Sequence, residues 1–172
     1  MIDVRPYAQL GAFQNDWLNT RHHFSFSSYH DPARMGFGRL RVWNDDEIAG
    51  GTGFDPHPHR EMEIVTYVRQ GAITHRDSLG NEGRTEAGDV QVMHAGTGIV
   101  HAEYNLEPGP TTLFQIWILP DRHGVTPGFR FAATQPMSLS EHAGHIVRRS
   151  LDSRHYGLML TVADKQAAWS MK

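Results

Sequence analysis

The 172-residue sequence contains no cysteine, and this absence excludes several kinds of site. Disulfide bonds, thiolate catalysis and cysteine-ligated zinc or iron–sulfur centres all require a thiol. A strong charge imbalance is also missing, because 16 basic and 19 acidic residues give a net charge of −3. We therefore expect no direct binding of nucleic acid, which depends on clustered positive charge.

Long apolar runs are missing as well. No stretch approaches the roughly 18 consecutive apolar residues of a membrane-spanning helix, so we expect no membrane insertion. Residues 1–13 lack the basic segment followed by an apolar segment that defines a secretory signal peptide. These absences predict a soluble, cytoplasmic protein.

Short runs rich in β-branched and aromatic residues dominate what is present, and turn-forming clusters separate them. The runs cover residues 39–43, 63–68, 72–77, 89–93 and 112–119. Runs of this length and spacing predict an all-β protein, built as an antiparallel sandwich or barrel. Evidence for helix is limited to two short candidates, at residues 14–19 and 138–144.

The composition becomes linker-like after Pro120, which predicts a barrel over residues 1–125 followed by a linker and a short remnant over 126–172. Two further strand candidates lie at residues 144–151 and 156–164. A tail of about 50 residues is too short to bury a core of its own. We expect it to pack on the barrel or on a second subunit.

Two histidine-containing pairs carry the chemical information. His57 and His59 flank a proline, and residues at i and i+2 point to the same side of an extended chain. His101 and Glu103 repeat this spacing after a glycine-rich turn. On neighbouring strands of one barrel, the two pairs would bring four metal ligands together. The alternative is that these histidines are ordinary surface residues on the rim of a barrel.

Three imidazoles and one carboxylate would leave open positions on a transition metal that prefers five or six ligands, as a catalytic site requires. Pro56 and Pro58 bias the first histidine pair to extended backbone and belong at a strand edge. The resulting stiffness limits the entropy that metal binding would cost.

The spacing of these residues resembles the two sequence motifs of the cupin superfamily. The first motif is matched by Gly51, His57, His59 and Glu63, with Gly71 one place late; the second is matched by Gly88, His94, Gly96, His101 and Asn105. His94 stands where proline is common, and the turn before His101 is longer than usual. More narrowly, "HPHREMEIVTY", "GDVQVMHAGTGIVHAEYN", "QIWILP" and "RHHFSFSSYHDP" resemble the pirin family over residues 1 to 130.

This resemblance implies a jelly-roll cupin barrel, the first barrel of a pirin-like bicupin whose C-terminal part is shortened. It implies one divalent metal per chain, held by the positions of His57, His59, His101 and Glu103. The family points to Fe(II), although such ligands also accept Ni, Cu, Mn, Co or Zn. The strand candidate at 156–164 would offer an unpaired edge, so we expect a homodimer.

Some pirins resemble quercetin 2,3-dioxygenases, which open the heterocyclic ring of a flavonol with O2 and release carbon monoxide. The implied mechanism binds the deprotonated 3-hydroxyl of the flavonol at an open metal position, with Glu103 as the general base. The alternative is a metal-dependent redox sensor or transcriptional co-regulator that binds a protein partner without turnover. A deep pocket with aromatic walls favours the enzyme, whereas a flat, exposed metal edge favours the regulator.

Further residues are weaker candidates for the surroundings of the site. Glu63 is a candidate for orienting a histidine, or else an exposed strand carboxylate; His22 and His94 are candidates for the mouth of the site, or else structural residues. The aromatic candidates for the pocket wall, which are alternatively plain core, are Phe24, Phe26, Phe54 and Tyr104. No partner is evident for His75.

Overall fold

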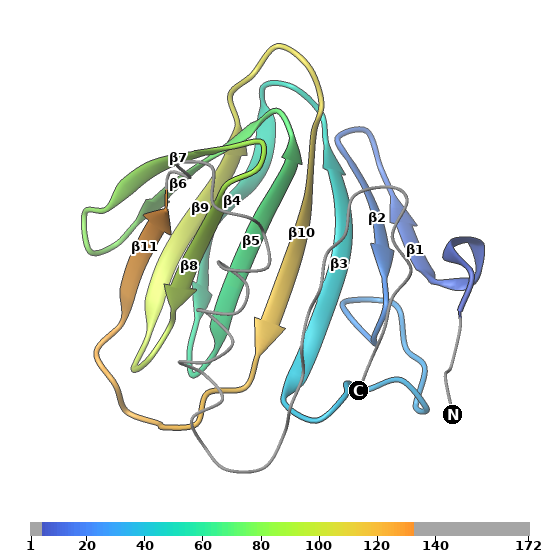
Figure 1. Cartoon of the computed structure of the whole chain (residues 1–172), viewed down its shortest axis with the longest axis horizontal. Coiled ribbons are helices and arrows are strands. Elements are labelled where there is room, and N and C mark those ends of the chain that lie inside the picture. The colour runs from blue at the N-terminus through green and yellow to red at the C-terminus, as the bar shows by residue number, and fades with distance from the viewer. Residues whose placement is uncertain (1–4, 133–172) are drawn as a thin grey trace. The chain divides into compact units, whose positions relative to one another are not determined.

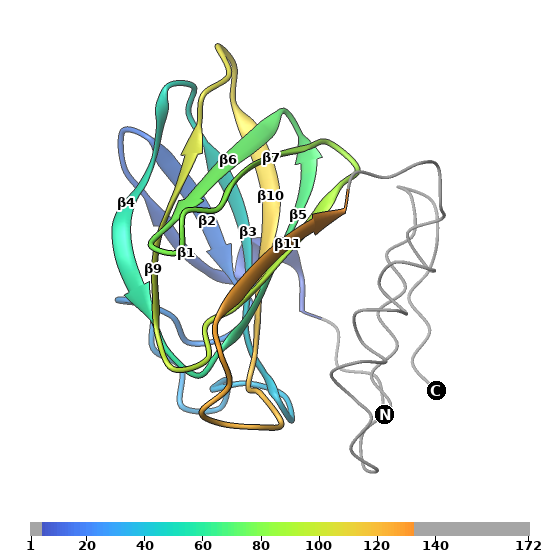
Figure 2. The same ribbon diagram turned by 90° about the vertical axis from the view of Figure 1, so that its left-hand side faces the viewer.

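The computed structural model describes residues 5–132, which form two antiparallel sheets (Figure 1). The seven-stranded sheet has the order β1-β2-β3-β10-β5-β8-β11, and the four-stranded sheet has the order β4-β9-β6-β7. Figure 2 shows the two sheets as facing layers. The all-β prediction and the cupin-type barrel are confirmed by this arrangement.

The strands are β1 (Gly11–Gln14), β2 (Leu18–His22), β3 (Leu40–Ile48), β4 (Thr52–His59), β5 (Glu63–Gln70), β6 (Ala72–Asp77), β7 (Glu82–Glu86), β8 (Val90–His94), β9 (Ile99–Asn105), β10 (Thr111–Ile118) and β11 (Gly128–Ala132). A single 3-10 turn, η1 (Tyr7–Gln9), precedes them. The five strand-like runs of the sequence correspond to β3, β5, β6, β8 and β10. Among the described residues, no helix has the length and apolarity needed to span a membrane.

The helical turn predicted over residues 14–19 is wrong, because this segment connects β1 to β2 as a hairpin. The side-chain oxygen of Asn15 accepts hydrogen bonds from the backbone N–H groups of Trp17 (3.0 Å) and Leu18 (2.8 Å). An asparagine side chain that caps its own turn in this way competes with helix formation.

Two other boundaries differ from the sequence prediction. The strand predicted over residues 39–43 continues to Ile48 as β3, into the turn-forming residues 44–51. It continues because its alternate side chains remain buried. The seven-stranded sheet extends to Ala132, beyond residue 125, where the sequence predicts the barrel to end, since β11 pairs with β8. The helix predicted at 138–144 and the strands predicted at 144–151 and 156–164 lie outside the described residues.

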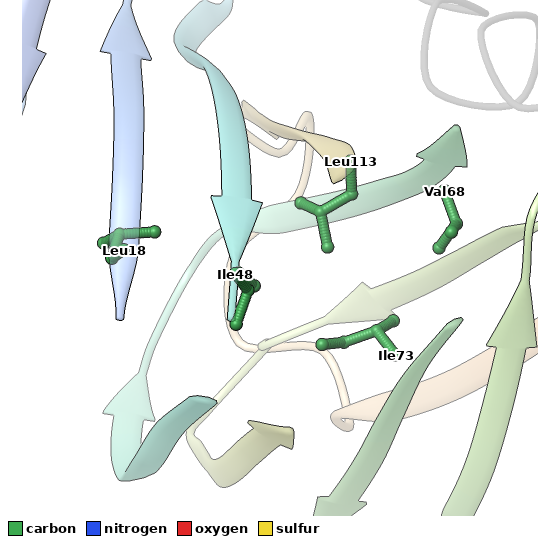
Figure 3. Close-up of a cluster of buried hydrophobic side chains, with 5 residues drawn as sticks. All are labelled: Leu18, Ile48, Val68, Ile73 and Leu113. Atoms are coloured by element: carbon green, nitrogen blue, oxygen red, sulfur yellow. The ribbon is translucent and has the colours of Figure 1, made fainter. Parts of the chain in front are cut away.

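The core lies between the sheets and forms around five buried aliphatic side chains (Figure 3). Four of them come from the seven-stranded sheet and one from the facing sheet: Leu18, Ile48, Val68, Leu113 and Ile73. A second cluster contains Ile64, Met93, Ala95 and Ile99, with Trp117 packed against it. Burial of apolar surface of this kind is the main stabilising contribution to the folded barrel.

Polar residues interrupt this apolar interior on β2 and β3. Thr20 and Asp46 face each other across the two strands, as do His22 and Asn44, and all four are buried. The Thr20 hydroxyl donates to Asp46, and His22 Nδ1 lies 2.9 Å from the side-chain oxygen of Asn44. Buried polar groups are costly unless they are paired, and the hydrogen bonds between these side chains offset that cost.

Candidate metal centre

Strands β4 and β9 bring three histidines together. His57 and His101 are direct cross-strand partners, and His59 follows two residues after His57 on the same face. β4 is the edge strand of its sheet, and its pairing with β9 shifts register between Phe54 and His57. An edge strand with a bulge tolerates Pro56 and Pro58, because a missing backbone N–H there costs little pairing.

The three imidazoles form a compact group. One ring nitrogen from each of His57, His59 and His101 lies within 4.8 Å of the others. Their ring centroids are 4.5 Å apart for His57 and His101, 4.8 Å for His57 and His59, and 4.9 Å for His59 and His101. Such a cluster of nitrogen donors has the spacing that a single metal ion can bridge.

A hydrogen bond orients the His57 ring, and His101 presents a buried nitrogen. His57 Nδ1 lies 2.7 Å from the backbone oxygen of Asp55, so Nδ1 carries the proton and Nε2 keeps its lone pair. His101 Nε2 is buried and has no hydrogen-bond partner. A buried nitrogen without a partner is unfavourable in a protein interior, and an ion bound by the cluster would satisfy it.

The electrostatics of the cluster favour the neutral form of His59 and His101. Burial lowers the pKa of His59 to about 4, with a further contribution from His57. Burial also lowers the pKa of His101, with His57, His59 and His75 acting in the same direction. Neutral imidazole is the form that binds metal, so protons do not compete with a metal for His59 and His101 near pH 7.

Glu103 lines the same pocket but is not part of the three-histidine group. One of its carboxylate oxygens lies within 4.8 Å of ring nitrogens of His75 and His101. Oε1 accepts hydrogen bonds from Gln91 and, at 3.3 Å, from Thr66, whereas Oε2 accepts one, at 2.8 Å, from the amide of Gln115. Because a carboxylate oxygen offers two lone pairs, Oε2 keeps one acceptor position for a proton or a metal.

A pocket of about 230 Å³ opens beside the histidines. Its apolar wall contains Phe13, Leu18, Phe26, Phe54, Ile64 and Trp117, and its polar wall contains Thr20, His22, Ser27, Asn44, Asp46 and Gln115. His57, His59, His101 and Glu103 complete the lining. The Trp117 ring meets His59 edge to face, with centroids 4.9 Å apart. The three-histidine group thus lies at the wall of an aromatic pocket rather than on a flat surface.

Of the weaker sequence candidates, the structure brings His22, Phe26 and Phe54 into the pocket wall. The other four lie elsewhere. Glu63 and His94 are cross-strand partners on β5 and β8, and His94 Nε2 contacts the backbone oxygen of Thr126 at 2.7 Å. The phenyl ring of Phe24 lies beside Arg34, and the Tyr104 hydroxyl donates to Asp55 outside the pocket.

Sequence reasoning missed the polar residues that surround the ligands. Thr66, Gln91 and Gln115 occupy inward positions on β5, β8 and β10, and all three are buried. The signal for them is a polar residue in register with apolar ones, as in "EIVTYV", "DVQVM" and "TLFQIWIL". This signal becomes specific only when the pairing of the strands is known.

A divalent transition metal fits the residues present. Three imidazoles converge, His101 Nε2 is a buried donor atom without a partner, and a carboxylate with one open acceptor position stands next to it. Nitrogen and oxygen donors of this kind bind Fe(II), Ni, Cu, Mn, Co and Zn.

Comparison with known proteins agrees with this geometry. The sequence profile of the Pirin family matches residues 3–118. A Caulobacter vibrioides protein named "Pirin-like protein" is 58% identical over 147 residues, covering 86% of this chain and 62% of its own length. The Escherichia coli K12 protein named "Quercetin 2,3-dioxygenase" is 48% identical over 145 residues, covering 81% of this chain and 62% of its own length. The chain therefore spans about 62% of the length of these curated relatives.

Solved structures give the same picture. The crystal structure of bacterial pirin YhhW from Escherichia coli in complex with nickel(II) has a TM-score of 0.72 and 47% identity, covering 74% of this chain and 56% of that chain. Another crystal structure of YhhW has a TM-score of 0.75 and 45% identity, covering 78% of this chain and 58% of that chain.

Proposed function

This chain belongs to the pirin family, and we propose that it is a metal-dependent dioxygenase that opens flavonols such as quercetin with O2. The observation that carries the proposal is the three-histidine group in the wall of a pocket lined by Phe13, Phe26, Phe54 and Trp117. The Escherichia coli K12 relative, which is 48% identical over the aligned residues, is named "Quercetin 2,3-dioxygenase".

The residues that would hold the metal are His57, His59 and His101, with Glu103 as the fourth ligand. A divalent metal in this position supplies Lewis acidity toward the 3-hydroxyl of a flavonol and redox chemistry toward O2. His57 and His59 lie on an edge strand that Pro56 and Pro58 stiffen, so little order has to be gained there when the metal is bound.

Glu103 is suited to accept the proton of the substrate hydroxyl. Burial raises the pKa of this carboxyl, opposed by the nearby His75 and His57 and by hydrogen bonds from Thr66 and Gln115. A raised pKa makes the carboxylate a stronger base. The one open lone pair on Oε2 can take either the metal or the proton, so Glu103 would act as the base once it no longer binds the metal.

The aromatic wall supports a flat, conjugated substrate. Phe26 packs edge-on against Trp117, with ring centroids 5.4 Å apart, and Phe54 packs edge-on against Trp17 at 5.0 Å. Rigid rings of this kind present apolar surface to a planar ligand and exclude water from the reacting atoms.

A redox sensor or transcriptional co-regulator is the second candidate. It would present its metal edge to a protein partner, whereas the candidate ligands here line a pocket and His101 is buried. Within residues 5–132, the geometry therefore favours the dioxygenase. Iron(II) as the bound metal, the homodimer and the cytoplasmic location stay predictions.

The test is the turnover of quercetin by the full chain loaded anaerobically with Fe(II) and then exposed to O2. We expect one carbon monoxide released per quercetin consumed, and a rate at least tenfold lower in a His59→Ala variant. His30→Ala is the matched control, because His30 is exposed and far from β4 in the sequence. Quercetin loss without carbon monoxide would contradict the proposal.

A further inference from the structure

A series of buried, hydrogen-bonded side chains runs from Asp77, the last residue of β6, to His101 on β9. His101 Nδ1 lies 3.2 Å from His75 Nδ1, and His75 Nε2 lies 3.0 Å from the Oδ2 oxygen of Asp77. The side chains of His75 and Asp77 are both fully buried. Asp77 therefore connects to the candidate metal centre through two imidazole rings.

The Asp77 end of this series is held firmly. The turn between β6 and β7 directs the backbone N–H groups of Leu79 (2.9 Å) and Asn81 (3.0 Å) to Oδ1, and the Asn81 amide donates to Oδ2 at 2.9 Å. Burial works to raise the pKa of Asp77, but hydrogen bonds from His75, Asn81 and Leu79 outweigh it and lower the pKa. Asp77 is thus an ionised carboxylate that can only accept hydrogen bonds.

The ionised carboxylate of Asp77 fixes the direction of both hydrogen bonds that connect it to His101 through His75. His75 Nε2 must carry a proton to donate to Asp77, so a neutral His75 has a lone pair on Nδ1. That lone pair accepts from His101 Nδ1, which must then be protonated. The remaining nitrogen of a neutral His101 is Nε2, the atom that is buried without a partner.

Packing fixes the orientation of the His75 ring, in addition to the hydrogen bonds that fix its protons. Phe129 on β11 stacks on the His75 imidazole with centroids 3.8 Å apart and planes 2° from parallel. The stacked ring keeps His75 in the plane that points its two nitrogens at His101 and Asp77. β11 therefore takes part in the support of the centre, although it contributes no ligand.

We propose that His75 and Asp77 are positioning residues that hold His101 in the tautomer with a lone pair on Nε2. Hydrogen-bonded partners behind a ligating histidine commonly raise metal affinity and set ring orientation. Here the partner is a second histidine anchored by a turn. The inference rests on the proposed metal site only for its effect on affinity, since the tautomer is a property of the metal-free protein.

An Asp77→Asn variant tests this inference because it reverses the direction of the hydrogen bonds between residue 77, His75 and His101. The volume of the side chain at position 77 stays nearly the same. The backbone N–H groups of Leu79 and Asn81 select the amide oxygen at the Oδ1 position, which leaves the NH2 group facing His75. The Asn81 side-chain amide then loses its bond at the Oδ2 position and keeps the one it donates, at 3.2 Å, to the oxygen at the Oδ1 position. His75 must then accept on Nε2 and donate from Nδ1. His101 accepts on Nδ1 and carries its proton on Nε2, where a metal would have to bind.

The primary measurement is the ¹⁵N spectrum of ring nitrogens in metal-free, ¹⁵N-histidine-labelled full chain. We expect His101 of the parent to be protonated on Nδ1 and unprotonated on Nε2, and this pattern to reverse in Asp77→Asn. Glu82→Gln is the matched control, since it removes one charge from the same hairpin at an exposed residue bonded to Arg76. A parent His101 protonated on Nε2 would overturn the inference, whether or not the variant folds.

The second measurement is a Ni(II) titration of the same three proteins. We expect binding to weaken roughly 10–100-fold in Asp77→Asn and to stay within twofold of the parent in Glu82→Gln. Unchanged binding by a folded Asp77→Asn would overturn the proposed role in affinity. Failure of the parent to bind nickel would count against the proposed function, whereas the spectrum would still decide the tautomer.

Discussion

At the scale of single residues, the site is defined by polar side chains at inward positions of apolar strands. The i, i+2 spacing predicted that His57, His59, His101 and Glu103 lie together, and all four line one pocket. Asp46 was not predictable, because it belongs to a run of acidic residues that resembles an exposed turn. Only the pairing of β2 with β3 shows that Asp46 faces the pocket opposite Thr20.

Asp46 makes stability depend on pH. Burial raises the pKa of Asp46 to about 7, opposed by the hydrogen bond from Thr20. The folded state therefore keeps a proton that the unfolded state has lost, and stability falls as pH rises through this range. Asp46→Asn removes this penalty, so its unfolding free energy relative to the parent should rise by on the order of 2 kcal/mol between pH 5 and pH 8.

Urea unfolding of the metal-free proteins at several pH values measures this difference. Asp16→Asn serves as the control, because Asp16 is exposed in the β1–β2 turn. A difference between Asp46→Asn and the parent that does not change with pH would mean that Asp46 is ionised at little cost in the folded protein.

At the scale of elements, the sequence predicted strands well where apolar residues are dense and poorly where turn-formers enter them. β7 was missed because "EGRTE" is polar and contains glycine, yet it pairs along its length with β6. β11 was missed because proline and glycine precede it. The pairing of β4 with β9, which assembles the histidines, depends on long-range contacts that one sequence does not specify.

Gly53 controls how closely β4 approaches β9. A Cβ atom at Gly53 would collide with the backbone of Glu103 and lie 2.6 Å from Tyr104 Cα. Gly53→Ala should therefore cost about 1–3 kcal/mol of unfolding free energy and weaken metal binding, because the two histidine strands must separate. Gly109→Ala is the control, since nothing lies within 4 Å of its added Cβ.

Chemical denaturation of the two variants measures their unfolding free energies, and Ni(II) titration measures their metal affinities. Equal stability and equal nickel affinity in Gly53→Ala would show that β4 and β9 need not be close for the histidines to meet.

At the scale of the whole molecule, metal binding should be linked to folding, because the ligands come from β4 and β9, two strands that meet only in the folded barrel. A metal that binds only the folded state adds about 2.7 kcal/mol at a free concentration one hundred times its Kd. For a chain of this size, that corresponds to a rise in Tm of roughly 5–10 °C. Differential scanning calorimetry with and without Ni(II) should show this rise in the parent and in His30→Ala, and little of it in His59→Ala.

The most direct test of the central claim is a calorimetric titration of Ni(II) into metal-free protein, compared between the parent and His59→Ala. His59 is the suitable position because it lies half-buried on an edge strand, where substitution leaves the core intact. We predict one site per parent chain and a loss of at least tenfold in affinity in the variant. A parent that binds no nickel, or a variant that binds it equally well, would contradict a metal centre built on His57, His59 and His101.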